Sequence, residues 1–259
     1  MRNKADKSII SSYLLSDVKV DTVESIASTN DEMKLRAMQG ESEISVLIAE
    51  SQTKGKGTKG RSFFSPDGSG CYMSLLLRPV YPAEDCTLLT TAAAVAVAKT
   101  IDKFTDKKAQ IKWVNDIYIS GKKVAGILTE ASLSKNGSVL DYAVVGIGIN
   151  LWTPDGGFPE EIRDIADSVG LKKDKKNEFI AGAINEFVHY YNNLTAREYL
   201  SEYRSRLFFL GQEVTVTQGA ETYIAKAVDI DSMCHLIVET DSGERKTLFA
   251  GEITVKPKQ

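Results

Sequence analysis

The stretch KGKGTKGRSFFSP, residues 54–66, interleaves glycines with positively charged side chains. Glycine lets backbone N–H groups approach an anion closely, and Lys and Arg neutralise phosphate or carboxylate charge. The stretch therefore predicts an anion-binding loop, and the alternative is a solvated, flexible surface loop. The cations concerned are Lys54, Lys56, Lys59 and Arg61.

Gly55, Gly57 and Gly60 fit G-x-G-x-x-G, the spacing of a dinucleotide-binding turn. That turn needs a helix directly after the glycines, because the helix N-terminus holds the pyrophosphate. Here RSFFSPDGSG and then strand-like residues follow. The P-loop pattern fails as well, because Arg61 and Ser62 follow the last glycine and no helix opens there. We therefore expect a strand–loop–strand unit.

A second polar cluster, KWVNDIY, occupies residues 112–118 at a predicted strand end. Lys112 can meet a phosphate. Asn115 can bind an adenine edge or join a metal shell, and Asp116 is a hard oxygen ligand of the type that Mg²⁺ prefers. The alternative for Asn115 and Asp116 is an ordinary β-turn.

Two further stretches place glycine within strand-like sequence. In KKVAGILTE, residues 122–130, Gly126 permits close approach of a ligand beside a cation, although an ordinary strand-edge lysine would give the same pattern. In GIGIN, residues 146–150, two glycines weaken an apolar strand. Either a ligand packed against the backbone or tight packing of the strand on a helix would account for them.

Hydrophobic periodicity and turn residues outline the elements that carry these stretches. The first helix, 30–39, can be capped by Thr29 or Asn30 and ended by Gly40. Lys135-Asn136-Gly137-Ser138 is a hairpin signal. The other predicted helices are 84–104, 175–192 and 196–208, and the predicted strands are 45–50, 71–79, 111–113, 116–120, 122–133 and 139–151.

The residue pattern changes from helical to strand-like after Gly211. Five short alternating strands follow in about fifty residues, which suggests a small barrel or sandwich. We place a boundary near 208–211 and predict two domains, 1–209 and 210–259.

Composition excludes several classes of protein. A net charge of −3 over 259 residues gives no overall basic field for nucleic acid. Membrane-length apolar runs and a signal-peptide core are absent from the sequence. The scattered cysteines predict free thiols in a reducing cytoplasm, and we expect no catalytic role for either histidine. These residues are Cys71, Cys86 and Cys234, with His189 and His235.

Taken together, four stretches resemble the biotin protein ligases in order and spacing. The resemblance covers about 25–210 as the catalytic domain, and the C-terminal strands resemble the small SH3-like domain of that family. It implies an α+β fold with a mixed, largely antiparallel central sheet, of the class II synthetase type. The four stretches are SIASTND (25–31), AESQTKGKGTKGRSFFSP (49–66), KWVNDIYISGKKVAGILTE (112–130) and VVGIGINL (144–151).

The resemblance implies that biotin and ATP, with Mg²⁺, form biotinyl-5′-adenylate, and that biotin then passes to one lysine of a biotin carboxyl carrier domain. It implies a catalytic role for Lys123, Arg61 and Lys112, with Asp116 as the metal ligand. The implied biotin-binding residues are Ser28, Thr29, Asn30, Gln52, Lys56, Gly57, Thr58, Lys123, Gly126 and Gly146. The implied ATP-binding residues are Arg61, Phe63, Lys112, Asn115, Asp116, Gly148 and Asn150.

Other readings stay open at this point. A lipoate or octanoate–protein ligase would share the fold and the acyl-adenylate chemistry, but the KWVND and GKGTKGR pair favours biotin. A regulatory module could bind nucleotide without turnover. Some family members carry a DNA-binding domain of roughly sixty residues before the STN segment; only 27 residues precede Ser28, so we expect a ligase alone. Family members are often dimers through the central sheet.

The sequence departs from the family pattern at two places. The family's loop usually reads closer to GRGRxGR, and Lys56 and Thr58 replace two of its arginines. Val114 stands where the family has proline. This replacement removes no chemical group, so we expect it to have a small effect on function. Because Thr58 carries no charge, we predict that the adenylate dissociates faster from this protein than from a Thr58→Arg variant. Equal release rates would contradict this prediction.

Overall fold

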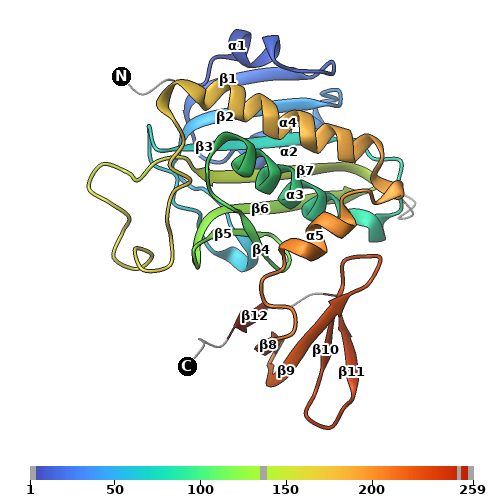
Figure 1. Cartoon of the computed structure of the whole chain (residues 1–259). Helices are drawn as coiled ribbons and strands as arrows, with labels where there is room; N and C mark the ends of the chain where they lie inside the picture. Colours follow the sequence, from blue (N-terminus) through green and yellow to red (C-terminus); the bar gives the residue numbers. More distant parts are fainter. Residues whose placement is uncertain (1–3, 135–138, 250–251, 256–259) are drawn as a thin grey trace.

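The computed structural model describes residues 4–134, 139–249 and 252–255, and it contains a mixed α+β fold (Figure 1). Its larger sheet has seven strands in the order β1-β2-β3-β7-β6-β5-β4. The pair β1–β2 is parallel, whereas the other neighbours are antiparallel. The strands are β1 (Lys19–Ile26), β2 (Ser45–Gln52), β3 (Gly70–Leu77), β4 (Gln110–Lys112), β5 (Asp116–Ile119), β6 (Lys122–Leu133) and β7 (Leu140–Asn150).

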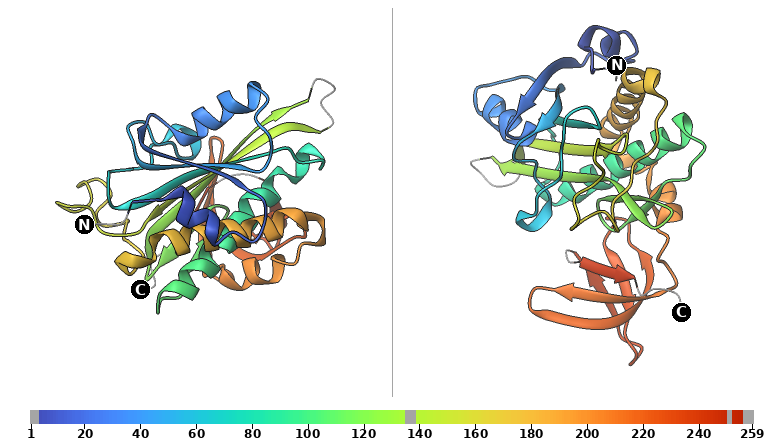
Figure 2. Two further views of the ribbon diagram at one scale, coloured as in Figure 1. Left: turned by 90° about the horizontal axis from the view of Figure 1, so that it is seen from above. Right: turned by 90° about the vertical axis from the view of Figure 1, so that its left-hand side faces the viewer.

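Helices cover both faces of this sheet (Figure 2). The long helices α3 and α4 pack against each other on one face, and α2 lies on the other. Because side chains alternate along a strand, β3 places Leu75 and Leu77 in the first core and Leu76 in the second. The helices are α1 (Lys7–Ser12), α2 (Thr29–Met38), α3 (Cys86–Phe104), α4 (Lys176–Asn192) and α5 (Leu200–Arg206).

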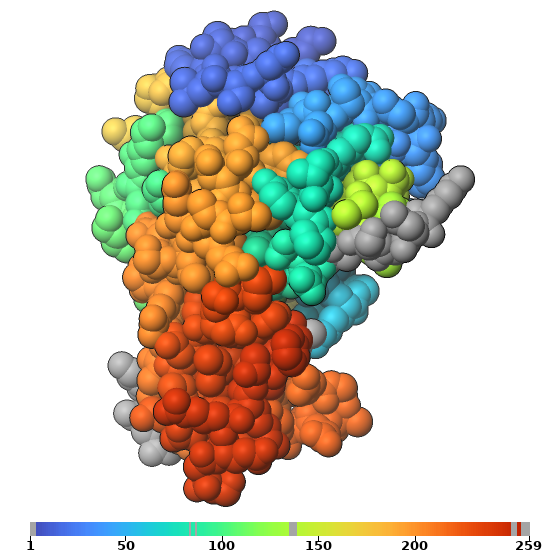
Figure 3. All heavy atoms as spheres, turned by 90° about the vertical axis from the view of Figure 1, so that its right-hand side faces the viewer, coloured from blue at the N-terminus to red at the C-terminus, as the bar shows by residue number. Residues whose placement is uncertain are grey.

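The C-terminal strands form a second, antiparallel sheet in the order β11-β10-β9-β8-β12, which protrudes below the rest of the molecule in Figure 3. The predicted fold class is confirmed by these two sheets and their helices. The boundary at 209/210 stays a prediction, and the second sheet itself begins at Glu213. Its strands are β8 (Glu213–Gln218), β9 (Glu221–Ile230), β10 (Leu236–Glu239), β11 (Arg245–Leu248) and β12 (Glu252–Val255).

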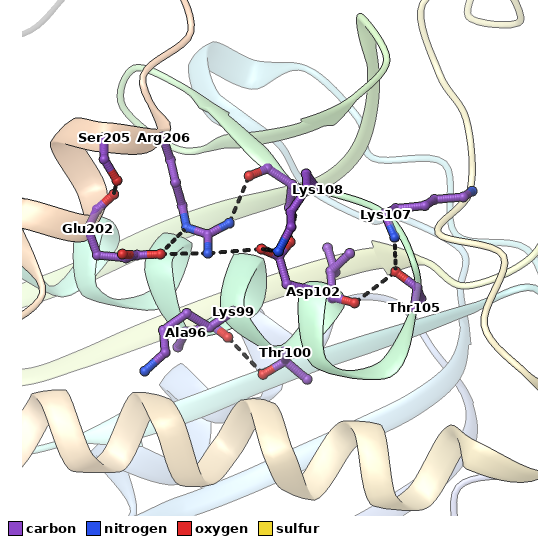
Figure 4. A network of polar contacts seen from close by, with 12 residues as sticks. Ala96, Lys99, Thr100, Asp102, Thr105, Lys107, Lys108, Glu202, Ser205 and Arg206 are labelled. Carbon is purple, nitrogen blue, oxygen red and sulfur yellow. Dashed lines mark hydrogen bonds and ion pairs between the residues drawn. The ribbon is translucent and has the colours of Figure 1, made fainter.

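Contacts fix the edge strand β4 and join the two sheets. The guanidinium of Arg206 in α5 donates to the carbonyl of Ala109 and pairs with Asp102 in α3 at 3.1 Å (Figure 4). Asp102 in turn accepts from the Ala109 N–H, so the start of β4 is held from two sides. At the other end of β4, the Trp113 indole N–H donates to the carbonyl of Cys234 in the C-terminal domain at 2.9 Å.

Some sequence predictions need correction. Ser28, not Thr29 or Asn30, is the N-cap of α2, and its hydroxyl accepts from the Asp31 N–H at 3.4 Å. The predicted helix 196–208 begins only at Leu200, because Leu194–Ala196 form a 3₁₀ turn that ends in the left-handed Arg197. The elements β1 and α1 were not predicted. The hairpin signal at 135–138 lies outside the described residues.

Among the described side chains, two cysteines are buried, and the two histidines lie in or beside regular elements. Cys71 and Cys234 are free and buried, and burial raises the pKa of their thiols to about 12 and about 11. His189 lies in α4 and His235 just before β10. Within the described part of the chain, no three metal-ligating side chains gather and no helix is long and apolar enough to cross a membrane.

Candidate active site

A cavity of about 430 Å³ opens over the face of the central sheet where α2 begins. This volume is in the usual range for small-molecule sites. Every site residue predicted from the sequence lines it: Ser28, Thr29, Asn30, Gln52, Lys56, Gly57, Thr58, Arg61, Phe63, Lys112, Asn115, Asp116, Lys123, Gly126, Gly146, Gly148 and Asn150. The structure thus brings together segments that are more than 100 residues apart in the chain.

The glycine loop forms a small hairpin at the mouth of this cavity. The Gly57 N–H donates to the Arg61 carbonyl at 2.7 Å, and the Phe63 N–H donates to the Gly55 carbonyl at 2.9 Å. A short 3₁₀ turn, Thr58–Gly60, closes the tip. β3 follows the hairpin, so the rejection of the two helix-dependent nucleotide motifs agrees with the structure.

One wall of the cavity is a fixed hydrogen-bond network around the first turn of α2. The N–H and hydroxyl of Thr29 donate to Gln52 Oε1 at 2.9 and 3.1 Å. Ser74 Oγ lies 2.6 Å from Asn30 Oδ1, and the Asn30 amide donates to Glu130 at 2.8 Å. Ser74 is fully buried. Sequence reasoning missed it, because a lone serine in an apolar strand gives no signal.

The glycines of β7 make room for side chains of the chain itself. A Cβ at Gly146 would overlap the amide of Asn30, and a Cβ at Gly148 would lie 2.6 Å from the Phe63 ring. Packing of a strand against α2 therefore accounts for Gly146, and packing against the glycine loop accounts for Gly148. At Gly126, a Cβ would lie 3.2 Å from the end of Lys123.

The opposite wall gathers the charged groups. Lys123 Nζ lies 2.6 Å from Asp116 Oδ1. Burial lowers the pKa of Lys112, and the nearby charges of Lys123 and Arg61 lower it further, against the opposing effect of Asp116. Such a site favours a ligand that brings negative charge.

The KWVND stretch is both a turn and a part of the cavity wall. β4 and β5 pair directly, with Lys112 opposite Asp116. The peptide bond between Trp113 and Val114 is cis. Asn115 donates from its amide to the Ile127 carbonyl at 2.7 Å, which ties the turn to β6. The two readings of Asn115 and Asp116 from the sequence, a β-turn and a site, are therefore compatible.

An apolar flap forms a wall that sequence reasoning missed. Phe158, Ile162, Ile165 and Ala166 line the cavity from the segment between β7 and α4. The flap is anchored at Lys123, whose N–H donates to the Ile165 carbonyl at 2.8 Å. The available signal was a set of apolar residues in a Pro- and Gly-rich loop directly after GIGIN.

A second cavity, of about 560 Å³, adjoins the first and shares its charged wall. Residues common to both are Thr58, Arg61, Lys112, Asn115 and Asp116. Phe249 and Ile253 of the C-terminal domain also line this second cavity. The C-terminal strands therefore border the charged side of the site.

Comparisons with known proteins agree with this arrangement. Residues 22–150 match the biotin/lipoate A/B protein ligase family, and residues 209–256 match the biotin protein ligase C terminal domain. The bifunctional ligase/repressor BirA of Bacillus spizizenii is 32% identical over 233 residues, which are 87% of this chain and 70% of that relative. The chain spans 65% of the BirA of Bacillus subtilis.

Two further relatives are similar over most of their length. The biotin–[acetyl-CoA-carboxylase] ligase of Mycobacterium tuberculosis is 27% identical, over 91% of this chain and 88% of that protein. The structure of the biotin protein ligase from Aquifex aeolicus in complex with biotin and ATP is 26% identical, with a TM-score of 0.76 over 93% of this chain and 99% of that one.

The mixed sheet followed by a small antiparallel domain is a fold that this chain shares with protein-modifying ligases. The chain belongs to the biotin/lipoate A/B protein ligase family. With the C-terminal domain included, its resemblance to the biotin protein ligases is confirmed.

Proposed function

We propose that this protein joins biotin to ATP, forming biotinyl-5′-AMP and pyrophosphate, and then transfers the biotinyl group to a lysine of a biotin carboxyl carrier domain. The observation that carries this proposal is the single cavity that all four family motifs line. It holds a polar, hydrogen-bonded wall for a neutral ring system at one side. At the other side it gathers cations for phosphate.

In the first step, a biotin carboxylate oxygen attacks the α-phosphorus, and the bond from this phosphorus to the pyrophosphate oxygen breaks. Several negative charges meet there, so positioning and charge stabilisation dominate the catalysis. Lys123, Arg61 and Lys112 supply positive charge along one wall. In the second step, the acceptor amine attacks the acyl carbon, the bond to the AMP oxygen breaks, and the amine loses a proton.

The residues around α2 would hold the biotin ring. Thr29 and Gln52 are already hydrogen-bonded to each other, and Asn30 is held by Ser74 and Glu130. Side chains fixed in this way lose little freedom when a ligand binds, so the site is organised beforehand. The flap and the glycine loop would shield the reactive adenylate from water.

The donor set also fits Mg²⁺. This ion is usually held by one or two carboxylates together with substrate phosphates, rather than by a cage of protein ligands. Asp116 offers one such carboxylate in the charged wall, beside Asn115. These two residues would hold the ion, which would neutralise phosphate charge. Without the ion, the pairing with Lys123 would balance the charge of Asp116.

Biotin-dependent exchange of pyrophosphate into ATP tests the proposed first step. We expect exchange with biotin and none with lipoate or octanoate in parallel assays. Exchange with lipoate alone would identify a lipoate–protein ligase of the same fold. Absence of exchange with all three acids, in a folded protein, would favour a binding module and contradict the proposal.

The lowered pKa of Lys112 predicts the pH dependence of the reaction. Only the protonated amine stabilises phosphate charge, so the contribution of Lys112 is complete at low pH and is lost as pH rises through its folded-state pKa. Because burial and neighbouring cations depress this pKa, activity should fall at a lower pH than for an ordinary lysine. Arginine stays protonated throughout, so Lys112→Arg should shift the alkaline limb of the kcat/KM profile, which reports the pKa values of the free enzyme, to higher pH. An unchanged limb would contradict this assignment.

A further inference from the structure

An unbroken series of charged and polar contacts connects the glycine loop to the polar wall of the cavity. Lys56 Nζ lies 2.5 Å from Asp31 Oδ1, and Lys34 Nζ lies 2.9 Å from the same oxygen. Lys34 also pairs with Glu130 at 2.6 Å, and Glu130 accepts from the Asn30 amide at 2.8 Å. Two cations and two carboxylates thus alternate between the loop, the helix α2 and the strand β6.

The position of Lys56 within the loop allows its contact with Asp31 to restrain the whole hairpin. Lys56 bridges to Ser62 across the hairpin, between the hydrogen bonds of Gly55 with Phe63 and of Gly57 with Arg61. The two arms of the hairpin therefore move together. A tether on Lys56 consequently holds the arm that carries Arg61 and Phe63 as well.

The electrostatics are consistent with a working ion-pair network. Burial alone would raise the pKa of Asp31, but hydrogen bonds from Lys56 and Lys34 outweigh it and lower that pKa. Burial alone would also raise the pKa of Glu130, but hydrogen bonds from Lys34 and Asn30 outweigh this effect and lower that pKa. The side chains of Lys56 and Asp31 are 39% and 44% exposed. A pair this exposed contributes little to global stability, so its effect should be local to the loop.

We propose that Asp31 is a positioning residue that holds the glycine loop over the cavity by pairing with Lys56. The pairing couples the loop to the same helix turn that carries Ser28, Thr29 and Asn30. The catalytic consequence rests on the proposed function, whereas the tether itself does not.

Trypsin cleavage of the protein without substrates tests the tether directly. The loop carries cleavage sites after Lys54, Lys56, Lys59 and Arg61, none of which precedes proline. Proteolysis of a loop follows its opening equilibrium. Loss of an exposed pair predicts cleavage about two to five times faster in Asp31→Asn than in the wild type.

Glu32→Gln is the matched control. Glu32 is the other carboxylate in the first turn of α2, and it pairs with Arg36 rather than with the loop. Both variants lose one favourable charge at the helix N-terminus, so a difference between them reports the loss of the Asp31 ion pairs, of which the pair with Lys56 is the one that reaches the loop. Added salt should bring wild-type cleavage close to that of Asp31→Asn and leave the variant unchanged. Equal loop cleavage in the two variants would overturn the proposal.

Pyrophosphate exchange on the same proteins separates this inference from the proposed function. We expect Asp31→Asn to raise the KM for biotin more than it lowers kcat, and Asp31→Glu to restore most of the loss. Faster loop cleavage in Asp31→Asn without any exchange in the wild type would leave the tether standing and refute the ligase function. If the wild type catalyses exchange but Asp31→Asn is indistinguishable from Glu32→Gln in both assays, the ligase function stands and the tether is refuted.

Discussion

Replacing Lys123 with methionine should reduce the rate of biotin-dependent pyrophosphate exchange by about 10²–10³. This is the usual cost of removing one preorganised group that stabilises developing charge. Methionine keeps a similar length and an unbranched stem but has no ammonium. Lys123 Nζ lies 2.6 Å from Asp116 and beside Gly126, in the charged wall of the cavity.

Lys122→Met is the matched control for this prediction. Lys122 is the neighbouring residue in β6, and its amine lies 3.4 Å from the Arg163 carbonyl at the surface. We expect its exchange rate to stay within about twofold of the wild type, as for other surface substitutions. A Lys123→Met enzyme with exchange within tenfold of the wild type would refute the catalytic role of Lys123. Supplying preformed biotinyl-AMP would show whether Lys123 also serves the transfer step.

Gly146→Ala is expected to abolish most biotin binding through a single methyl group. The added Cβ would overlap the amide of Asn30, which Ser74, Glu130 and the Leu128 carbonyl hold in place. Overpacking of this kind costs about 1–3 kcal/mol of stability. Moving Asn30 by about 1 Å in a preorganised site should lower kcat/KM for biotin about 10²-fold.

The double variant Gly146→Ala, Asn30→Ala separates the two effects. Without the Asn30 amide the clash disappears, so the free energy of unfolding should recover relative to Gly146→Ala alone. Biotin affinity should not recover, because the polar wall is now incomplete. Denaturant unfolding and biotin binding by calorimetry measure the two quantities. Unchanged stability in the single variant would show that the strand accommodates the methyl group.

The parts of the site that lie in short motifs could be predicted from the sequence. Lys112, Asn115 and Asp116 are close in the chain and follow directly from a strand end, so their juxtaposition needs no knowledge of the fold. Gly146 and Gly148 were conspicuous because they interrupt an apolar strand. Their neighbours across the cavity, Asn30 and Phe63, depend on tertiary packing that the sequence does not display.

The apolar flap could not be predicted for a different reason. Phe158, Ile162 and Ile165 have the helical spacing i, i+4 and i+7, but the segment that carries them forms turns and no helix. Periodicity indicates at most which face of a segment is apolar, so it could not show that this face lines a cavity. The edge strand β1 (Lys19–Ile26) escaped prediction because most of its side chains are polar or only partly buried.

The contact between Trp113 and Cys234 has a consequence for how this protein can diverge. The acceptor is a main-chain oxygen, so the side chain at 234 can be exchanged during evolution without loss of the contact. Cys234 has a φ of 61°, a conformation that glycine and asparagine adopt more easily than cysteine. We therefore expect related sequences to preserve the length and backbone path of this loop, while the residue type at position 234 varies.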